Sequence, residues 1–420
     1  MQKGVRGTMR YKNWHGLCLC CEQEYFPEDA RDVDAPFTPL VFLVKRDPHH
    51  RRGLFAIREL AELYEGESVR LLAPCPAGGE AADSELAQLV HAHGASVLNV
   101  AFGRAFTYLR SFMDRPKDGL KVTLAGLGDV GGTVLTGLTL LGREIREIAV
   151  YDPYDAMCQR YELEMNQIIP TDTGRAMPRI TICPQEQLFD CDVFLFAASR
   201  GVPGLNSAAQ DVRMAQYDAN RDMLREYAQQ ARAAQFMGLI CQIADPVDHL
   251  CRGIFLQSNQ NEDGSYDWNG LLPEQIQGFG LGVMAGRAAY YADKKAIAFD
   301  NGRLYGPHGT GLIVANDPCD AYDDALSCQL TEWTRGANMR VRELGFKPYI
   351  APGLSSAAIS VLQYLRGEMH YGAVPIDGAY FGCTNRISGQ GLLLRRERIC
   401  PPLMNRIKQS HATLKEFDYE

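Results

Sequence analysis

The chain has 420 residues, which is enough for two or three domains with a large core. Its formal net charge of −8 argues against nucleic acid or an anionic membrane surface as the main partner. The opening residues, MQKGVRGTMRYKNWHG, lack the apolar segment of a signal peptide, and the 13 cysteines show no paired spacing. We therefore expect reduced thiols and a cytoplasmic protein.

The one cluster of cysteines lies near the N-terminus. Cys18, Cys20 and Cys21 follow closely after His15. Zinc sites usually have a two-residue gap between paired cysteines and a second pair further along, and this cluster has neither. We predict no metal site here, and expect free thiols or a poorly ordered arm.

Residues 1–119 are predicted to form an N-terminal α/β extension. VFLVK (41–45) and SVRLLAP (68–74) have the apolar character of buried strands. GLFAIRELAELYEG (53–66), which lies between them, and SELAQLVHAHG (84–94) have helical spacing. ASVLNVAFG (95–103) is a candidate third strand, and the turn-forming DRPKDG marks the end of the extension.

The most informative stretch is LKVTLAGLGDVGGTVLTGLTLLGREIREIAVYD (120–152), which has the order strand, glycine turn, helix, strand and acidic end. A G-x-G-x-x-G motif is formed by Gly126, Gly128 and Gly131. This spacing gives a tight turn, room for a pyrophosphate and close packing of helix on strand. The helix that starts near Asp129 and Val130 directs free N–H groups towards phosphate. Asp152 can accept hydrogen bonds from a ribose and would repel a 2′-phosphate, so we expect NAD rather than NADP. A glycine-rich turn without a ligand is the alternative.

Strands and helices alternate from residue 120 onward, which predicts a parallel sheet with helices on both faces. DVFLFAAS (192–199) and MGLICQIAD (237–245) are predicted strands, joined by a helix over residues 211–236. Beyond residue 246 the pattern is mixed, with helices near 283–295 and 322–343 and β-rich pieces near 296–315 and 376–397. The predicted fold is therefore α/β, with a Rossmann-type doubly wound parallel sheet over 120–246 and a mixed α+β substrate domain over 247–420.

A series of short motifs in order resembles the lactate/malate dehydrogenases over roughly residues 120–400. The motifs are Gly126-Leu-Gly-Asp-Val-Gly-Gly, Asp152, Asp192-Val-Phe-Leu-Phe-Ala-Ala, Arg213 with Asn220 seven residues later, Pro246-Val-Asp248, Arg287 and Gly306-Pro-His308-Gly309. Each motif alone is weak, and the resemblance depends on their order.

The resemblance implies a role for four polar side chains. His308 is similar to the histidine that exchanges a proton with the substrate oxygen while hydride moves to or from nicotinamide, a role that suits imidazole near neutral pH. Arg287 resembles the arginine that holds the substrate carboxylate bidentately. Arg213 resembles the loop arginine that polarises the substrate carbonyl, and Asn220 the asparagine near the nicotinamide. The plainer alternatives are a turn histidine, surface arginines and a solvated asparagine.

Three features depart from the family pattern. Met284 stands where the family has the aspartate that orients the catalytic histidine. Asp245 replaces the asparagine before Pro-Val-Asp, at the carboxyl edge of the sheet where ligands of open α/β folds bind. We hypothesise that the carboxylate has moved to Asp245, where it pairs with His308 or meets a cationic substrate group. A helix cap is the alternative.

The third departure is the segment from Arg200 to Arg213, which is longer than the family's substrate-discriminating loop. Its glycines and proline give it the character of a lid. We predict that Arg200 contacts the substrate. An open, inactive loop is the alternative.

The leading hypothesis from the sequence is an NAD-dependent oxidoreductase that acts between a 2-hydroxy acid and a 2-oxo acid. A reductase of imines or amino-acid-derived keto acids is the first alternative, favoured by Asp245 and Met284. A catalytically silent NAD-binding protein is the second. We expect a small-molecule substrate, no nucleic acid or membrane partner and, by resemblance, a homodimer or homotetramer.

Overall fold

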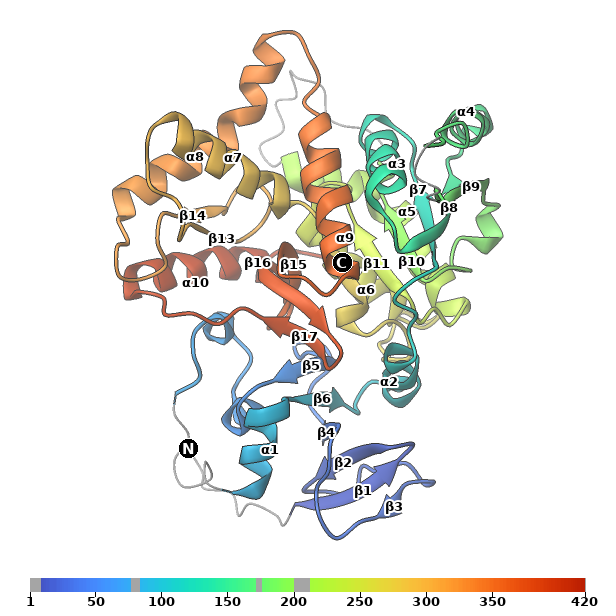
Figure 1. Ribbon diagram of the computed structural model, residues 1–420, viewed down its shortest axis with the longest axis vertical. Coiled ribbons are helices and arrows are strands. Elements are labelled where there is room, and N and C mark those ends of the chain that lie inside the picture. The colour runs from blue at the N-terminus through green and yellow to red at the C-terminus, as the bar shows by residue number, and fades with distance from the viewer. Residues whose placement is uncertain (1–8, 77–83, 171–175, 200–211, 420) are drawn as a thin grey trace.

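The structure is a computed structural model that describes residues 9–76, 84–170, 176–199 and 212–419, with the backbone alone for residues 212–216. Figure 1 shows the N-terminal segment at one end of the molecule and the predicted dinucleotide unit at the other. The C-terminal half of the chain lies between and above them. Its last helix, residues 401–415, packs on the strand at residues 379–388 and on residues 69–72 of the N-terminal segment.

The predicted dinucleotide unit contains six strands: β7 (Leu120–Ala125), β8 (Ile145–Tyr151), β9 (Arg179–Ile182), β10 (Val193–Phe196), β11 (Leu239–Gln242) and β12 (Ile276–Gly278). They are parallel and lie side by side in the order β9-β8-β7-β10-β11-β12. Doubly wound dinucleotide-binding sheets have this order, so the predicted fold class is confirmed. The helices of the unit are α3 (Asp129–Leu141), α4 (Asp155–Met165), α5 (Val212–Ala233) and α6 (Val247–Ser258), with a short 3-10 helix η3 (Gln185–Gln187).

The strands of this unit are apolar because helices cover both faces of a parallel sheet. All four residues of β10 and of β11 are buried. None of the described helices is both long and apolar enough to cross a membrane.

The C-terminal part of the chain first adds helices and a hairpin, then returns to the sheet. Its elements are the 3-10 helix η4 (Pro273–Gln275) before β12, then α7 (Leu281–Lys294), β13 (Arg303–Tyr305), β14 (Ile313–Ala315), α8 (Asp324–Glu343), the π-helix η5 (Pro352–Ile359), α9 (Ser360–Leu365), β15 (His370–Ile376), β16 (Ala379–Ser388), β17 (Gly391–Leu394) and α10 (Pro401–Lys415). β15 pairs antiparallel with β12 through Ala373 and Gly278. The predicted mixed α+β segment therefore extends the same sheet.

The N-terminal segment completes the sheet. Its elements are β1 (Arg10–Trp14), β2 (Leu17–Cys21), β3 (Arg31–Asp32), β4 (Leu40–Val44), β5 (Leu54–Ile57), the 3-10 helices η1 (Leu60–Tyr64) and η2 (Val69–Leu72), α1 (Glu85–His93), β6 (Ala95–Asn99) and α2 (Ala105–Met113). β5 pairs in parallel with β17, with Phe55 opposite Leu392. The result is one 15-stranded sheet in the order β3-β1-β2-β4-β6-β5-β17-β16-β15-β12-β11-β10-β7-β8-β9.

Two predicted elements of the N-terminal segment are wrong. The strand expected at 68–74 is the 3-10 helix η2, which begins after Ser68, where the serine hydroxyl accepts the N–H of Arg70. The helix expected at 53–66 is the strand β5 followed by the 3-10 helix η1. Both are short apolar runs, for which periodicity does not separate strand from helix. The strands predicted at 41–45 and 95–103 and the helix at 84–94 are confirmed by β4, β6 and α1.

The cysteine cluster lies in β2 and its members are free thiols, so the first expectation holds and the alternative of a poorly ordered arm is wrong. Both faces of this strand are buried: Cys18 and Cys20 pack into one apolar cluster, and Cys21 into another. The sulfur atoms of Cys18 and Cys20 lie 3.9 Å apart. Across the described ranges, no three His, Cys, Asp or Glu side chains gather as metal ligands do.

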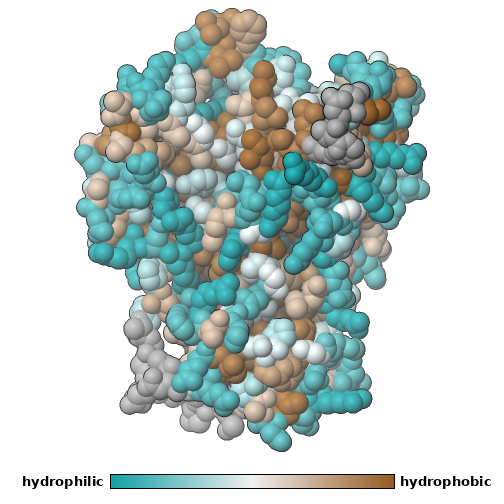
Figure 2. Space-filling view, viewed as in Figure 1, coloured by the Kyte–Doolittle hydropathy of each residue, from teal (hydrophilic) through white to brown (hydrophobic). Residues whose placement is uncertain are grey.

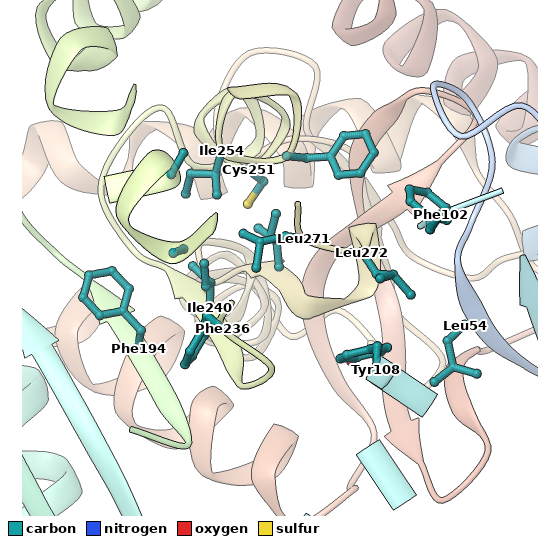
Figure 3. Close-up of a cluster of buried hydrophobic side chains, with 14 of the residues drawn as sticks. Leu54, Phe102, Tyr108, Phe194, Phe236, Ile240, Cys251, Ile254, Leu271 and Leu272 are labelled. Carbon is teal, nitrogen blue, oxygen red and sulfur yellow. The ribbon is translucent and has the colours of Figure 1, made fainter. Parts of the chain in front are cut away.

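One buried apolar cluster crosses the predicted boundary at residue 119. Figure 3 shows Leu54 and Tyr108 from the N-terminal segment near Leu272, with Phe194 and Ile240 of the parallel unit further into the same core. The boundaries at 119 and 246 stay predictions. The shared sheet and shared core mean that the three segments pack as neighbours in one body.

Candidate functional site

Several residues of the site lie where strands of the parallel unit end. The glycine turn follows β7, Asp152 follows β8, Asp245 follows β11 and Gly280 follows β12. The carboxyl ends of parallel strands meet at one edge of a sheet, and ligands of open α/β folds bind there. The strand order reverses between β7 and β10, and Gly126 packs on Ala198, just after β10. The glycine turn therefore lies at the topological switch point.

Each glycine of the turn has its own structural reason. Gly126 has a φ of +95°, and a Cβ there would overlap the backbone of Ala198. A Cβ on Gly131 would overlap the carbonyl oxygen of Gly126, so this glycine permits the close approach of α3 to β7. Gly128 is exposed, and a Cβ there would meet no atom within 4 Å. The neighbouring Val130 is half-buried and packs on the core below. The space in front of the helix N-terminus is thus open at Gly128.

Two carboxylates border this turn. Asp152 accepts the N–H of Leu127 at 2.9 Å and that of Tyr154 at 3.0 Å, one on each oxygen. It holds the turn in place, and each carboxylate oxygen can accept a further hydrogen bond. Asp129, the first residue of α3, forms an ion pair of 2.9 Å with Lys347. This lysine offsets the negative charge of Asp129 at the helix N-terminus.

His308 lies in the loop between β13 and β14, next to Asp245. Its Nδ1 atom is 3.3 Å from Oδ1 of Asp245, which is an ion-pair distance. The geometry is not that of a hydrogen bond, and the buried Nδ1 donates to no described residue. The imidazole is 15% exposed and the Asp245 carboxylate 56%, so the carboxylate also reaches solvent. Asp248 accepts the backbone N–H of His308 at 3.0 Å and fixes the loop.

The imidazole rests against a glycine. A Cβ on Gly280 would lie 2.7 Å from both Cβ and Nδ1 of His308. The hydroxyl of Ser356 donates to the Gly280 carbonyl at 2.7 Å and accepts the N–H of Val283 at 2.8 Å. These bonds tie η5 to the start of α7 and fix the backbone beneath the ring. The orientation of His308 therefore depends on the absence of a side chain at position 280.

Arg287, on α7, is the cationic group of the site. Its guanidinium donates to Asn338 Oδ1 on α8 and to the sulfur of Met284 at 3.6 Å. Burial lowers the pKa of Arg287, while Tyr291 and Asp245 act to raise it. Met284 is buried and uncharged. The Asp245 carboxylate thus lies within ion-pair distance of His308, and its charge also acts to raise the pKa of Arg287.

Arg287 also faces a groove of about 790 Å³ between α7, α8 and residues 347–359. Tyr290, Lys347 and Ile350 line this groove. Figure 2 shows apolar side chains at the top of the molecule, over the segment that joins α8 to η5. The exposed Leu344 and Ile350 belong to this region. The groove therefore combines an apolar wall with cationic groups.

Three predicted residues lie on or before α5. Arg200 falls outside the described residues, and the side chain of Arg213, in the first turn of α5, is also outside them. Asn220 is fully buried, so the alternative of a solvated asparagine is wrong. It shares a helix face with Tyr217 and Leu224, which pack on Gly253 of α6. The roles predicted for Arg200 and Arg213 stay predictions.

Several residues beside the site were not found by sequence reasoning. Asn338 contacts Arg287, and Lys347 contacts Asp129. The partners of each pair are far apart in the chain, and no local pattern indicates either contact. Gly280 is one of several glycines in GFGLGVMAG, and nothing in that run identifies it as the contact of the imidazole. Asp248 was quoted as part of Pro246-Val-Asp248, but its hydrogen bond to the His308 backbone requires the fold.

The chain matches no protein-family model and no curated protein sequence. Its fold is similar to solved structures of dehydrogenases. The malate dehydrogenase of Plasmodium falciparum has a TM-score of 0.56 and 17% identity, over 70% of this chain and 96% of that one. The minor L-lactate dehydrogenase of Enterococcus mundtii has a TM-score of 0.57 and 16% identity, over 71% and 97%. MGS-M5, a lactate dehydrogenase from a Medee basin deep-sea metagenome library, has a TM-score of 0.57 and 14% identity, over 71% and 98%.

These alignments cover nearly the whole of each dehydrogenase and leave about three tenths of this chain outside them. The strand order β9-β8-β7-β10-β11-β12 and the hairpin that carries His308 are consistent with this likeness. The chain thus has a lactate/malate dehydrogenase-like fold.

Proposed function

We propose that the protein is an NAD-dependent oxidoreductase that transfers hydride between nicotinamide and a 2-hydroxy or 2-oxo acid. The observation that carries this proposal is the pair of His308 and Asp245, 3.3 Å apart at the carboxyl edge of the sheet. A proton-exchanging imidazole with a carboxylate partner is what the reduction of a carbonyl requires beside a hydride donor.

The residues present fit a dinucleotide. Gly128 leaves open space at the N-terminus of α3, where free N–H groups favour phosphate. The Asp152 oxygens retain acceptor capacity for ribose hydroxyls, and their charge disfavours a 2′-phosphate. One solved neighbour, a malate dehydrogenase from Plasmodium falciparum, is described as a complex with NADH. When bound, the nicotinamide would supply or accept the hydride.

The side chains of this chain would do the remaining work. His308 would give a proton to the substrate oxygen in reduction and take it back in oxidation. Asp245 would hold the imidazole and stabilise its charged form through Nδ1. Arg287 has donors left besides those used by Asn338 and Met284, so it could hold a substrate carboxylate. The proposed roles of Arg213 and Arg200 are to polarise the carbonyl and to contact the substrate, and Asn220 would lie near the nicotinamide.

The test has two steps. NADH is first titrated into the full chain and followed by fluorescence, with NADPH as the comparison. A panel of 2-oxo acids is then supplied and NADH oxidation is measured for the wild type and for His308→Gln. We expect NADH to bind more tightly than NADPH, and oxidation with at least one acid to depend on His308. Failure to bind either nucleotide would overturn the proposal, and NADH binding without turnover would leave a catalytically silent NAD-binding protein.

A second candidate is the reduction of imines or amino-acid-derived keto acids. Asp245 favours it, because its carboxylate is 56% exposed and stands where the family pattern has a neutral asparagine. An exposed carboxylate beside His308 could hold a cationic nitrogen of the substrate. The same panel with added ammonium distinguishes this candidate, because only an imine reductase would then oxidise NADH faster.

A further inference from the structure

A small recess lies where the N-terminal segment meets α6 and the turn between β15 and β16. The loop that follows β4, residues 48–52, forms one wall, and Arg252, Phe255 and Asp377 lie opposite. The recess is partly open, and its volume is about 10 Å³, which is close to the room that one water molecule needs. Figure 3 shows the neighbouring α6 residues Cys251 and Ile254 directed into the core near Leu271 and Leu272.

The side chains around this recess are strongly basic, and some are already neutralised. Arg52 pairs with Glu67 at 3.0 Å, and His50 pairs with Asp47 at 2.7 Å. The one carboxylate that lines the recess, Asp377, pairs with Lys415 at 3.0 Å. These three pairs leave Arg51 and Arg252 to set the net charge of the recess, and that charge is positive.

Arg252 is the central feature. It is 5% exposed, yet within the described part of the chain its guanidinium makes no hydrogen bond or ion pair; it lies 5.2 Å from the ring centre of Phe255, and its charge is felt by Tyr380 and, more weakly, by Asp47. None of its nitrogens is among the fully enclosed polar atoms that lack a partner, so they remain accessible from the recess. A buried guanidinium with no carboxylate in ion-pair contact is costly, and its planar fork matches an oxyanion.

His49 stands beside this guanidinium. Partial burial and the charge of Arg252 lower the pKa of His49 to about 4, so its imidazole is neutral near pH 7 and offers one N–H. Its ring packs edge-on against Tyr266 and Trp268, with centroids 5.5 and 5.8 Å away. These contacts hold the ring in place. Arg51, which has no ion pair to any described residue, is half-buried and also lines the recess.

We propose that this recess binds the oxyanion group of a small ligand, a phosphate or a carboxylate, through Arg252 with His49 and Arg51. The proposal is independent of the NAD-dependent function, since the recess is built from the N-terminal segment, α6 and the β15–β16 turn. The small volume admits one oxygen atom of the oxyanion, and the rest of the ligand would lie outside the recess, near Arg51.

The test is calorimetric titration of the full chain with sodium phosphate and, separately, with sodium succinate, against sodium chloride of equal ionic strength. Arg252→Met keeps the length of the side chain over Phe255 and removes its charge. Arg160→Met, in the exposed Arg160–Glu164 pair on α4, is the matched control. We expect saturable binding of at least one oxyanion to the wild type and to the control, and at least tenfold weaker binding to Arg252→Met. Phosphate alone would indicate a phosphoryl ligand, and succinate alone a carboxylate.

Two results would overturn the proposal. One is the absence of saturable binding beyond that seen with chloride, and the other is wild-type binding by Arg252→Met. If that variant does not fold, as judged by circular dichroism, His49→Phe replaces it, because phenylalanine retains the contacts with Tyr266 and Trp268 but donates no hydrogen bond. Unchanged oxyanion binding by His49→Phe would then contradict the proposal. Phosphate that binds at the glycine turn would bind equally to the wild type and to every variant, so it would not contribute to the difference in affinity between them.

Discussion

At the scale of single residues, the carboxylate beside His308 sets the chemistry of the site. Met284 cannot orient the imidazole, whereas Asp245 lies within ion-pair distance of its Nδ1. We predict that Asp245→Asn lowers kcat/KM by about 10- to 100-fold, because the imidazolium loses its charge partner. In the reduction of a 2-oxo acid the imidazolium donates the proton, so the fall in rate on the alkaline side of the pH–rate profile should begin at lower pH. Asp190→Asn, which removes a carboxylate from an exposed pair with Lys121, is the control. Equal rates and equal pH profiles for Asp245→Asn and the wild type would refute the relocated carboxylate.

Gly280 offers a second test at the same scale. A Cβ at this position would lie 2.7 Å from Cβ and Nδ1 of His308, so Gly280→Ala must displace the ring. We predict that turnover falls by about 100-fold while NADH binding is retained, since a displacement near 1 Å is costly for a reacting group. Gly336→Ala on α8, where a Cβ meets nothing within 4 Å, is the matched control. Full activity of Gly280→Ala would show that the ring position does not limit the reaction.

At the scale of elements, the glycine turn separates folding from ligand binding. A Cβ on Gly131 would overlap the carbonyl oxygen of Gly126, whereas a Cβ on Gly128 would enter open space. We predict that Gly131→Ala lowers the free energy of unfolding by about 1–3 kcal/mol, as overpacking does. Gly128→Ala should change it by less than about 0.5 kcal/mol. Gly128→Ala should nevertheless weaken NADH binding at least tenfold, because a pyrophosphate must approach the bare backbone. Denaturant titration and NADH fluorescence measure both effects, and normal NADH affinity of Gly128→Ala would argue against a cradle at this turn.

Elements with a long-range partner were the hardest to predict. The order β7-turn-α3-β8 follows from local pattern, because apolar strands, glycines and a helix lie next to one another in the chain. β5 was missed because its identity as a strand comes from pairing with β6 and with β17, near the other end of the chain. The contact of His308 with Asp245 was proposed from the departures at 284 and 245. The contacts of Arg287 with Asn338 and of Gly280 with His308 depend on packing between helices and a loop, which periodicity does not report.

At the scale of the whole molecule, the buried groups His370 and Glu274 bind different numbers of protons in the folded and unfolded states, so each makes stability depend on pH. His370 is buried, and burial lowers its pKa to about 4. Gln277 donates to His370 Nε2 at 2.8 Å and to Asn385 at 2.7 Å, and Asn385 in turn donates to the carbonyls of Gly372 and Cys383. Because Gln277 donates to Nε2 of His370, that nitrogen carries no proton and the imidazole is neutral. As pH falls from 6.5 through about 4, the unfolded state takes up a proton that the folded state does not, so stability is lost on acidification.

Glu274 acts in the opposite direction. Its carboxyl group joins the segments, because it accepts the N–H groups of Gly53 and Leu54 across the junction with the N-terminal segment. Burial raises its pKa to about 7, although these hydrogen bonds and Arg52 act to lower it. The folded state then holds a proton that the unfolded state releases. The contribution of Glu274 is present below pH 4.5 and is lost as pH rises through about 7.

The contributions of His370 and Glu274 oppose each other between pH 4.5 and 6.5, and His49, whose pKa is also lowered to about 4, acts in the same direction as His370. His370→Phe keeps the stack on Phe279, and its free energy of unfolding, relative to that of the wild type, should rise on acidification by up to about 1.4 kcal/mol per pH unit. Glu274→Gln should show the reverse slope. Urea titrations at several pH values measure these slopes, with the exposed His93→Gln as the control that runs parallel to the wild type. Parallel curves for all four proteins would mean that neither buried group changes its protonation on folding, and that the Glu274 junction is held by a carboxylate already ionised in the folded chain.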